Sequence, residues 1–247
     1  ACLPVLMERV GTLARIAAKA GLWLNIDAEE ADRLELSLVI FERLLHDPAL
    51  ADWPGLGLVV QAYQRRAGAV IDHISALAET KRRNISVRLV KGAYWDMEIK
   101  RAQVLGLSDY PVFTRKENTD LSYLFCAQTL LRASARVFPQ FATHNAHTAL
   151  AIMRLAGSHR KFEFQRLHGM GTALHDRLTQ TYGVPSRIYA PVGSHKGLLP
   201  YLVRRLLENG ANGSFVNQMM DDEVPLSTVA EDPISKVLTN RAAANPL

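Results

Sequence analysis

The segment ISVRLVKGAYW, residues 85–95, is the stretch that decides the predicted fold. Its apolar, β-rich start, Ile85–Val90, is typical of a buried strand, yet this strand contains Arg88. Burying an unpaired charge is costly, so Arg88 needs a partner, either a structural carboxylate such as Asp27 or an electron-rich cofactor ring. The next residues, Lys91–Ala93, add a cation and unobstructed backbone amides, which a phosphate can approach. The sequence therefore predicts a strand that ends at a binding site.

Five other short segments share this apolar, β-rich character. They are Leu22–Asp27, Leu56–Ala62, Arg136–Ala142, Phe162–Leu167 and Arg187–Val192. The longer segments between them carry apolar residues at helical spacing, and no hairpin turn signal joins neighbouring strands. This alternation favours parallel strands joined by crossover helices.

Side chains that can bind a ligand or take part in a reaction follow nearly every predicted strand, for example Asp27 after the first and His144 after the fourth. In an open doubly wound sheet, such groups concentrate where the strand order reverses. In a closed barrel they gather at the carboxyl ends of many strands, because the loops there share one mouth. The sequence therefore favours an α/β barrel over an open sheet.

The composition is that of an ordinary soluble globular protein. Of its 247 residues, 48% are hydrophobic and 21% are charged, and this length suits one α/β barrel domain. The net charge of +5 is spread along the chain, and the short basic runs fall where helices should end, so we expect no nucleic-acid partner. No apolar run is long enough to span a bilayer and no signal pattern begins the chain, so a cytoplasmic location is expected.

Neither a disulfide framework nor a metal site is expected. Cys2 and Cys126 are far apart in the sequence, and Cys126 is expected to be buried helix packing. His144 and His147 have a spacing that could share a helix turn, but no third metal ligand is near them. His144, at a strand end before a helix, better suits a hydrogen bond to a ligand phosphate or sugar. The chain also lacks the glycine-rich fingerprints of nicotinamide-binding folds.

The segment Leu198–Asn209 predicts a mainly apolar helix with one polar stripe. The stripe follows i, i+3, i+4 and i+7 spacing and consists of Tyr201, Arg204, Arg205 and Glu208. Two adjacent guanidinium groups suit a small carboxylate, since each can donate in a planar fork. A solvated surface stripe with an Arg204–Glu208 pair fits the same spacing. From spacing alone, both interpretations stay open.

Taken together, five segments resemble the proline dehydrogenase domain of the bifunctional proline utilization A flavoenzymes. These segments are NIDAEE at 25–30, RLVKGAYW at 88–95, QFATHN at 140–145, LHGMG at 167–171 and YLVRRLLENG at 201–210. The resemblance runs from about Leu6 to Asn217, and motifs in the family's order are far more specific than any one of them. It implies a (β/α)8 barrel of the TIM type.

The resemblance also implies an activity. The chain would catalyse the FAD-dependent oxidation of L-proline to Δ1-pyrroline-5-carboxylate by hydride transfer to the flavin, and the electrons would pass to a quinone. A pyrroline-5-carboxylate dehydrogenase would be fused or associated, and the bacterial parent protein would contact the inner membrane peripherally. Two alternatives stay open: a flavin oxidoreductase for another cyclic imino acid such as hydroxyproline, and a catalytically incompetent barrel fragment.

The resemblance assigns roles to individual residues. The catalytic set would be Asp27, Arg88, Tyr189, Arg204 and Arg205. The last two would bind the substrate carboxylate, and the residues that enclose the proline ring would be Tyr201, Tyr94, Leu89 and Leu167. The cofactor-binding residues would be Ala28, Gln61, Arg88, Lys91, Gly92, Ala93, Trp95, Thr114, Thr143, His144, Asn145, Gln165 and Glu208.

The predicted strands depart from the family pattern in number. The family barrel has eight strands, and the six predicted here match its third to eighth. In the family, the other two carry an acidic gate and a lysine that joins the arginine pair. We therefore expect a barrel over residues 1–220 that lacks its first two strands, and an extension or linker over residues 221–247. An unseen stretch, a separate fragment or a truncation would each explain the difference.

Overall fold

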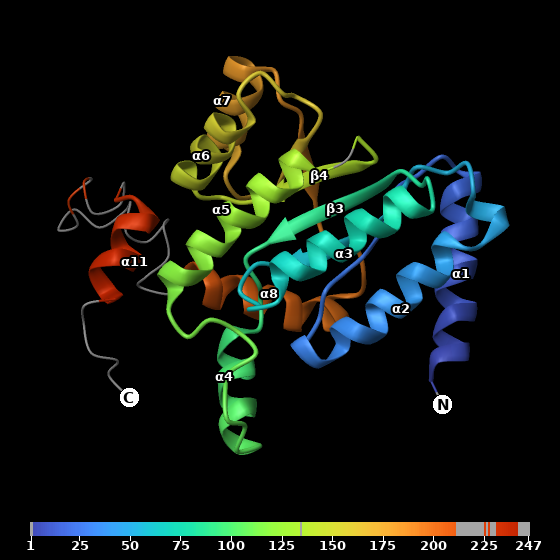
Figure 1. The fold of residues 1–247 in the computed structure, drawn as a ribbon, viewed down its shortest axis with the longest axis horizontal. Coiled ribbons are helices and arrows are strands. Elements are labelled where there is room, and N and C mark those ends of the chain that lie inside the picture. Colours follow the sequence, from blue (N-terminus) through green and yellow to red (C-terminus); the bar gives the residue numbers. More distant parts are fainter. Residues whose placement is uncertain (1, 134, 211–224, 226, 228–230, 242–247) are drawn as a thin grey trace.

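The structure, a computed structural model, describes residues 2–133, 135–210, 225, 227 and 231–241 (Figure 1). Side chains are described for these residues except 206–210 and 240–241. Six parallel strands pair in sequential order, and their bounds are β1 Leu24–Ile26, β2 Leu56–Gln61, β3 Ile85–Val90, β4 Val137–Ala142, β5 Glu163–Leu167 and β6 Ser186–Tyr189. Each predicted strand is present. The sixth ends at Tyr189 rather than at Val192, because Pro191 has no N–H to donate to a neighbouring strand.

Helices connect the strands along the chain. Their bounds are α1 Leu3–Lys19, α2 Leu34–Leu45, α3 Ala67–Thr80, α4 Trp95–Val104, α5 Lys116–Arg132, α6 Ala146–Ala156, α7 Thr172–Tyr182 and α8 His195–Gly210. Short 3₁₀ helices precede and follow α2, at Ala31–Arg33 and Pro48–Leu50. Figure 1 shows α3 and α5 along one face of the sheet, with α8 near the carboxyl end of β3. The alternation of strands and helices confirms the predicted α/β organisation.

The hydrophobic core lies between the sheet and these helices. Val87 and Leu89 of β3 belong to it and are fully buried together with Phe141 of β4 and Tyr123 of α5. Because side chains alternate along a strand, Arg88 points to the opposite, inner face of the sheet. The core therefore holds β3 in place, and Arg88 points from this strand toward the binding face.

The sheet forms half of a barrel. Within the described residues, β1 pairs only with β2 and β6 only with β5, so each leaves one edge without a neighbouring strand. This arrangement agrees with the expectation of an α/β barrel in which about six of eight strands are evident. In the described part of the chain, no helix is both long and apolar enough to cross a membrane.

Most of the expected extension over residues 221–247 lies outside the described residues. Its described part contains α11, Pro233–Arg241, which contacts α5. The apolar spacing there is too weak to predict this helix, which begins at a proline, a residue that suits the first helical position. Cys126 is fully buried in α5, as predicted.

Candidate active site

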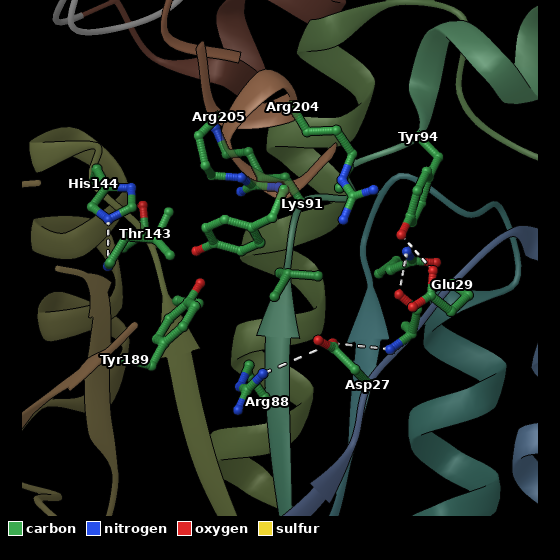
Figure 2. A pocket seen from close by; sticks show the side chains of 18 of the residues that line it. Asp27, Glu29, Arg88, Lys91, Tyr94, Thr143, His144, Tyr189, Arg204 and Arg205 are labelled. Carbon is green, nitrogen blue, oxygen red and sulfur yellow. Dashed lines mark hydrogen bonds and ion pairs between the residues drawn. The ribbon is translucent and has the colours of Figure 1, made fainter. Parts of the chain in front are cut away.

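A cavity of about 320 Å³ opens at the carboxyl ends of the strands (Figure 2). Pockets for small molecules and cofactors usually measure about 300–1,000 Å³. It is lined by Asp27, Ala28, Glu29, Gln61, Arg88, Val90, Lys91, Gly92, Ala93, Tyr94, Lys116, Ala142, Thr143, His144, Asn145, Leu167, Tyr189, Tyr201, Arg204 and Arg205. All six strands or the loops that follow them contribute, so the cavity is the shared mouth that the sequence predicts.

Arg88 reaches the cavity from β3. Its Nη1 lies 3.8 Å from Asp27 Oδ1, and its guanidinium carbon lies 5.3 Å from the ring centroid of Tyr189. The Asp27 side chain is 70% exposed, so this ion pair is loose and compensates the cation only in part. The Arg88 Nε atom is buried and has no hydrogen-bond partner among the described residues. Asp27 is thus the carboxylate partner expected from the sequence, and donor capacity remains for a ligand.

The polar stripe of α8 faces the cavity. Tyr201, Arg204 and Arg205 line it, and Figure 2 shows both arginines above the strand ends. The Arg204 guanidinium carbon lies 5.3 Å from the ring centroid of Tyr94, and that of Arg205 lies 5.4 Å from the ring centroid of Tyr201. Aromatic faces attract cations and hold them in place. For these two arginines, the geometry favours the ligand-binding interpretation over a solvated surface stripe.

Tyr94 connects this wall to the loop after β1. Its hydroxyl donates a hydrogen bond to the Glu29 carboxylate. Burial and the neighbouring Glu29 raise the pKa of Tyr94 to about 12, so the hydroxyl remains a donor at neutral pH. The hydrogen bond therefore fixes the aromatic ring over which Arg204 lies.

Two lysines and one aspartate form a charged cluster at the cavity. Lys91 and Lys116 both pair with Asp120, Lys116 at 2.8 Å. Burial by itself would raise the pKa of Asp120, but the two lysines together lower it below its ordinary value. One carboxylate between two lysines leaves a net positive charge, which suits a phosphate.

Gly92, which follows Lys91, has a φ of 132°, and a side chain there would overlap the ring of Tyr63.

His144 is held as one tautomer. The backbone N–H of Leu167 donates to His144 Nε2 at 3.1 Å, so the proton of the neutral ring lies on Nδ1. Burial, and then the neighbouring His175, Arg205 and Arg166, lower the pKa of His144 to about 4. At neutral pH the ring is therefore uncharged and offers an Nδ1–H donor, as a bond to a phosphate or sugar oxygen requires.

The turn around His144 is held by its own hydrogen bonds. Thr143 Oγ1 accepts from the backbone N–H of Asn145 at 3.1 Å, and Asn145 Oδ1 caps α6 by accepting from Thr148 N at 2.9 Å. His175 Nε2 lies 2.9 Å from the Thr143 carbonyl oxygen. In the described part of the chain, no group of three or more histidine, cysteine, aspartate or glutamate side chains could hold a metal ion.

Leu89 does not line the cavity, contrary to its expected place beside the substrate. Its side chain is fully buried in the core between sheet and helices. Strand alternation explains this, because Leu89 follows Arg88 directly and must point to the other face. Val90 is the cavity-lining neighbour instead, and alternation from Arg88 could have identified it from the sequence.

Three predicted cofactor contacts, Trp95, Thr114 and Gln165, also lie outside the lining. Trp95 is 41% exposed and donates from Nε1 to the Phe113 carbonyl oxygen at 2.8 Å. Thr114 is exposed, and Gln165 is buried in β5. The side chain of Glu208 lies outside the described residues.

Besides Val90, three lining residues had no predicted role: Glu29, Lys116 and Ala142. Ala142 lies at a strand end, where alternation points it inward with Gln140. Glu29 lies two positions after Asp27, in the same loop. Lys116 comes from the start of α5, and its approach to the cavity depends on tertiary packing that no local pattern reveals.

The fold and the site define an α/β-barrel protein with a cationic ligand pocket at the carboxyl ends of its strands. A family model described as proline dehydrogenase matches residues 3–218. The chain therefore belongs to the proline dehydrogenase family.

Among curated proteins, the chain is 54% identical over 240 residues to bifunctional protein PutA of Salmonella typhimurium. The aligned region covers 94% of this chain and 18% of that protein. It is 30% identical over 224 residues to human mitochondrial proline dehydrogenase 1, which covers 83% of this chain and 35% of that protein.

Solved structures agree with the fold. A mutant of Bradyrhizobium japonicum proline utilization A (PutA) is 53% identical and superposes with a TM-score of 0.95 over 99% of this chain and 25% of the other. PutA from Bdellovibrio bacteriovorus, inactivated by N-propargylglycine, is 33% identical and has a TM-score of 0.90 over 95% of this chain. The predicted family and barrel class are confirmed. The chain spans 18% of the Salmonella PutA that it matches.

Proposed function

We propose that this chain forms part of an FAD-dependent proline dehydrogenase, which oxidises L-proline to Δ1-pyrroline-5-carboxylate. One observation carries the proposal: Arg88, Arg204 and Arg205 line a single cavity at the carboxyl ends of the strands. A small carboxylate and a ring that gains negative charge on reduction both need cations of this kind. Membership in the proline dehydrogenase family supports the same activity.

The residues at the cavity fit a flavin nucleotide. Arg88 has a buried Nε without a hydrogen-bond partner in the described part of the chain, so it has donor capacity to offer. Lys91 and Lys116 share Asp120 and leave positive charge for phosphates. The lining residues that would hold FAD are Ala28, Gln61, Arg88, Lys91, Gly92, Ala93, Thr143, His144 and Asn145. Trp95, Thr114 and Gln165 remain predicted contacts beyond this lining, and Glu208 remains a predicted contact whose side chain lies outside the described residues.

The substrate carboxylate is assigned to Arg204 and Arg205. Their guanidinium groups lie over Tyr94 and Tyr201, which limits their freedom before the substrate arrives. Tyr94, Tyr201 and Leu167 supply apolar surface for the proline ring. Two guanidinium groups that bind one carboxylate, next to the rings of Tyr94 and Tyr201, define both the position and the orientation of a small cyclic amino acid.

Catalysis by these residues is positioning combined with electrostatics. Arg204 and Arg205 orient the substrate, and the aromatic walls exclude water from it. FAD, when bound, supplies the hydride acceptor. Arg88, which lies near Asp27 and over the ring of Tyr189, would stabilise negative charge that develops near it during reduction.

Further partners follow from this reaction. We propose that a quinone takes up the electrons, at a membrane surface that the parent protein contacts peripherally. The PutA relatives are named bifunctional, and the chain covers 18% of the Salmonella protein. A pyrroline-5-carboxylate dehydrogenase, fused or associated, would then consume the product.

The flavin spectrum of the complete polypeptide that carries this chain tests the proposal. We expect a yellow protein whose visible flavin absorbance bleaches when L-proline is added without oxygen. Trans-4-hydroxy-L-proline serves as the comparison, because its hydroxyl needs both room and a polar partner beside the ring. A colourless protein that takes up no FAD, or a flavin that L-proline leaves oxidised, contradicts the proposal.

A further inference from the structure

A second polar layer lies on the inner face of the sheet, and none of the roles above uses it. We call it the polar belt, and it consists of Asn25, Ser86, Gln140, Glu163 and Arg187. Its members come from β1, β3, β4, β5 and β6, so it crosses the whole half-barrel. Ser86, Gln140 and Glu163 are 0%, 2% and 4% exposed. Arg187, at the end of the layer, has a side chain that is 52% exposed. The buried members must satisfy their hydrogen bonds within the protein.

The hydrogen bonds of the polar belt have a fixed direction. Glu163 accepts from Gln140 Nε2 at 3.0 Å and from two nitrogens of Arg187 at 2.8 and 2.9 Å. The Gln140 oxygen therefore faces Asn25, whose Nδ2 donates to it at 2.6 Å. The Asn25 oxygen in turn accepts from the Ser86 hydroxyl at 2.9 Å. Because an ionised carboxylate only accepts hydrogen bonds, Glu163 determines the orientation of both amides.

The sheet makes room for this layer at Gly57. Gly57 lies in β2 between Asn25 and Ser86, in register with both. A side chain at Gly57 would overlap the Ser86 hydroxyl and the Asn25 amide oxygen. The polar belt is therefore built into the strand register.

Gln165 is attached to the same carboxylate. Its Nε2 donates to Glu163 Oε1 at 2.7 Å, so its amide oxygen is the atom that does not face Glu163. This residue is 1% exposed, and its Oε1 has no hydrogen-bond partner among the described residues. A buried carbonyl oxygen without a donor is unfavourable. The Gln165 oxygen is thus an acceptor that lacks its donor.

The register of the strands places Gln165 at the level of the cavity. It pairs with Ala142 of β4, and Val90 of β3 pairs with Gln61 of β2. Ala142, Val90 and Gln61 all line the cavity. Residues paired across neighbouring strands point to the same face of a sheet, so Gln165 extends a row of cavity-facing positions.

We propose that Glu163 is a positioning residue that makes Gln165 an obligatory hydrogen-bond acceptor for the bound ligand. An amide that can rotate presents either its oxygen or its nitrogen to a ligand, whereas the Gln165 nitrogen donates to Glu163 and its oxygen, which can only accept, is fixed on the opposite side. The ligand must then present a donor at this point. The inference rests on the proposed function: in the oxidised isoalloxazine ring of FAD, N3–H is the only N–H group. Gln165 Oε1 is therefore assigned to N3–H, and it selects the imide edge of the ring.

The test compares the binding of FAD and of 3-methyl-FAD, in which a methyl group replaces the N3 hydrogen. Dissociation constants are measured by titration of the apoprotein of the complete polypeptide. The unaltered protein should bind FAD about tenfold or more tightly than 3-methyl-FAD, since methylation leaves the buried acceptor without a donor. Both flavins are titrated into the same protein, so a general loss of folded protein does not change the ratio.

Two variants separate the hydrogen bond from steric exclusion. Gln165→Leu removes the acceptor and should bring the ratio near one. Glu163→Gln keeps the size of residue 165 but lets its amide rotate, so the ratio should shrink although the steric fit is unchanged. The exposed Gln103 of α4 provides the control, and Gln103→Leu should keep the full ratio.

Three results would overturn the inference. The unaltered protein could bind both flavins equally, which would mean that N3–H is not recognised. The preference could persist in full in Gln165→Leu and Glu163→Gln, which would mean that size alone excludes the methyl group. The unaltered protein could bind neither flavin, which would refute the proposed function as well.

Discussion

At the scale of single residues, the planar guanidinium group explains why arginines stand at the proposed carboxylate site. Arg204 and Arg205 lie over the rings of Tyr94 and Tyr201, and Glu29 holds Tyr94 through its hydroxyl. A lysine can neither stack in this way nor donate two parallel hydrogen bonds. The site is thus arranged before the ligand arrives, which reduces the entropy lost on binding.

Replacing either arginine should weaken the binding of a proline-like carboxylate. For Arg204→Met or Arg205→Met, we expect the dissociation constant of tetrahydro-2-furoic acid to rise by a factor of about 10 to 150, the effect of losing a charged hydrogen-bond donor. Calorimetric titration of the flavin-loaded protein measures it. Arg101→Met is the matched control, because Arg101 is an exposed arginine of α4 that pairs with Asp32. Equal affinities in all three variants would contradict the assignment.

His144 should make stability depend on pH. Its pKa in the folded protein is about 4, against an ordinary value of 6.5. Between these values the unfolded chain binds a proton that the folded protein does not, so stability falls as the pH decreases through this window. The slope for one such histidine is about 1.4 kcal/mol per pH unit. Urea unfolding across this range should show that the free energy of unfolding depends less steeply on pH in His144→Asn than in the unaltered protein. The pH dependence that remains is assigned to His175, whose pKa burial also lowers. An unchanged slope would contradict this.

At the scale of elements, the strands were predictable because each is a short apolar run between helical patterns. Their inner and outer faces were less predictable. Arg88 could be recognised as exceptional, because a charge inside an apolar strand demands a partner. Leu89 was placed beside the substrate on the strength of the family resemblance, but it directly follows Arg88, and successive strand residues point to opposite faces. Contacts of the Gln140–Glu163 kind could not be predicted, since they depend on strand register.

The pairing of β3 with β4 is reinforced from behind by Tyr123 of α5. Its hydroxyl lies 3.2 Å from the Leu89 carbonyl oxygen and 3.1 Å from that of Ala142. These two carbonyls belong to the strand ends that carry Arg88 and Thr143 into the cavity. The buried Tyr123 side chain thus supports the ends of both β3 and β4, from which residues reach the proposed flavin site.

Tyr123→Phe should therefore destabilise the protein while preserving most of the packing. Leaving buried carbonyl oxygens without their donor costs about 1–3 kcal/mol, so we expect a loss of this size in the free energy of unfolding. Urea unfolding measures it in the complete polypeptide. Tyr182→Phe removes the hydroxyl of a partly exposed tyrosine in α7 and should change stability little. If both variants were equally stable, the bridging hydrogen bonds would contribute nothing.

At the scale of the whole molecule, the half-barrel has two strand edges to satisfy. In the described part of the chain, the outer edges of β1 and β6 have no neighbouring strand. Open edges invite pairing with other chains, and a closed barrel removes them. The sequence indicated this shape through its strand count. It could not reveal α11 against α5, because tertiary contact rather than local periodicity stabilises that helix.

The 247-residue chain expressed by itself should therefore retain FAD poorly. We expect a low ratio of flavin to protein after gel filtration, self-association through the strand edges and little turnover of L-proline. The complete polypeptide that carries the chain, purified in the same way, is the control. A monomeric, yellow 247-residue chain that oxidises L-proline would contradict the expectation.

A crystal structure of the complete polypeptide with FAD and tetrahydro-2-furoic acid tests the central claim most directly. We predict that the carboxylate of the analogue lies between the Arg204 and Arg205 guanidinium groups, and that the isoalloxazine ring lies against Arg88 in the same cavity. An analogue or a flavin bound elsewhere, with these three arginines facing neither of them, would contradict the account.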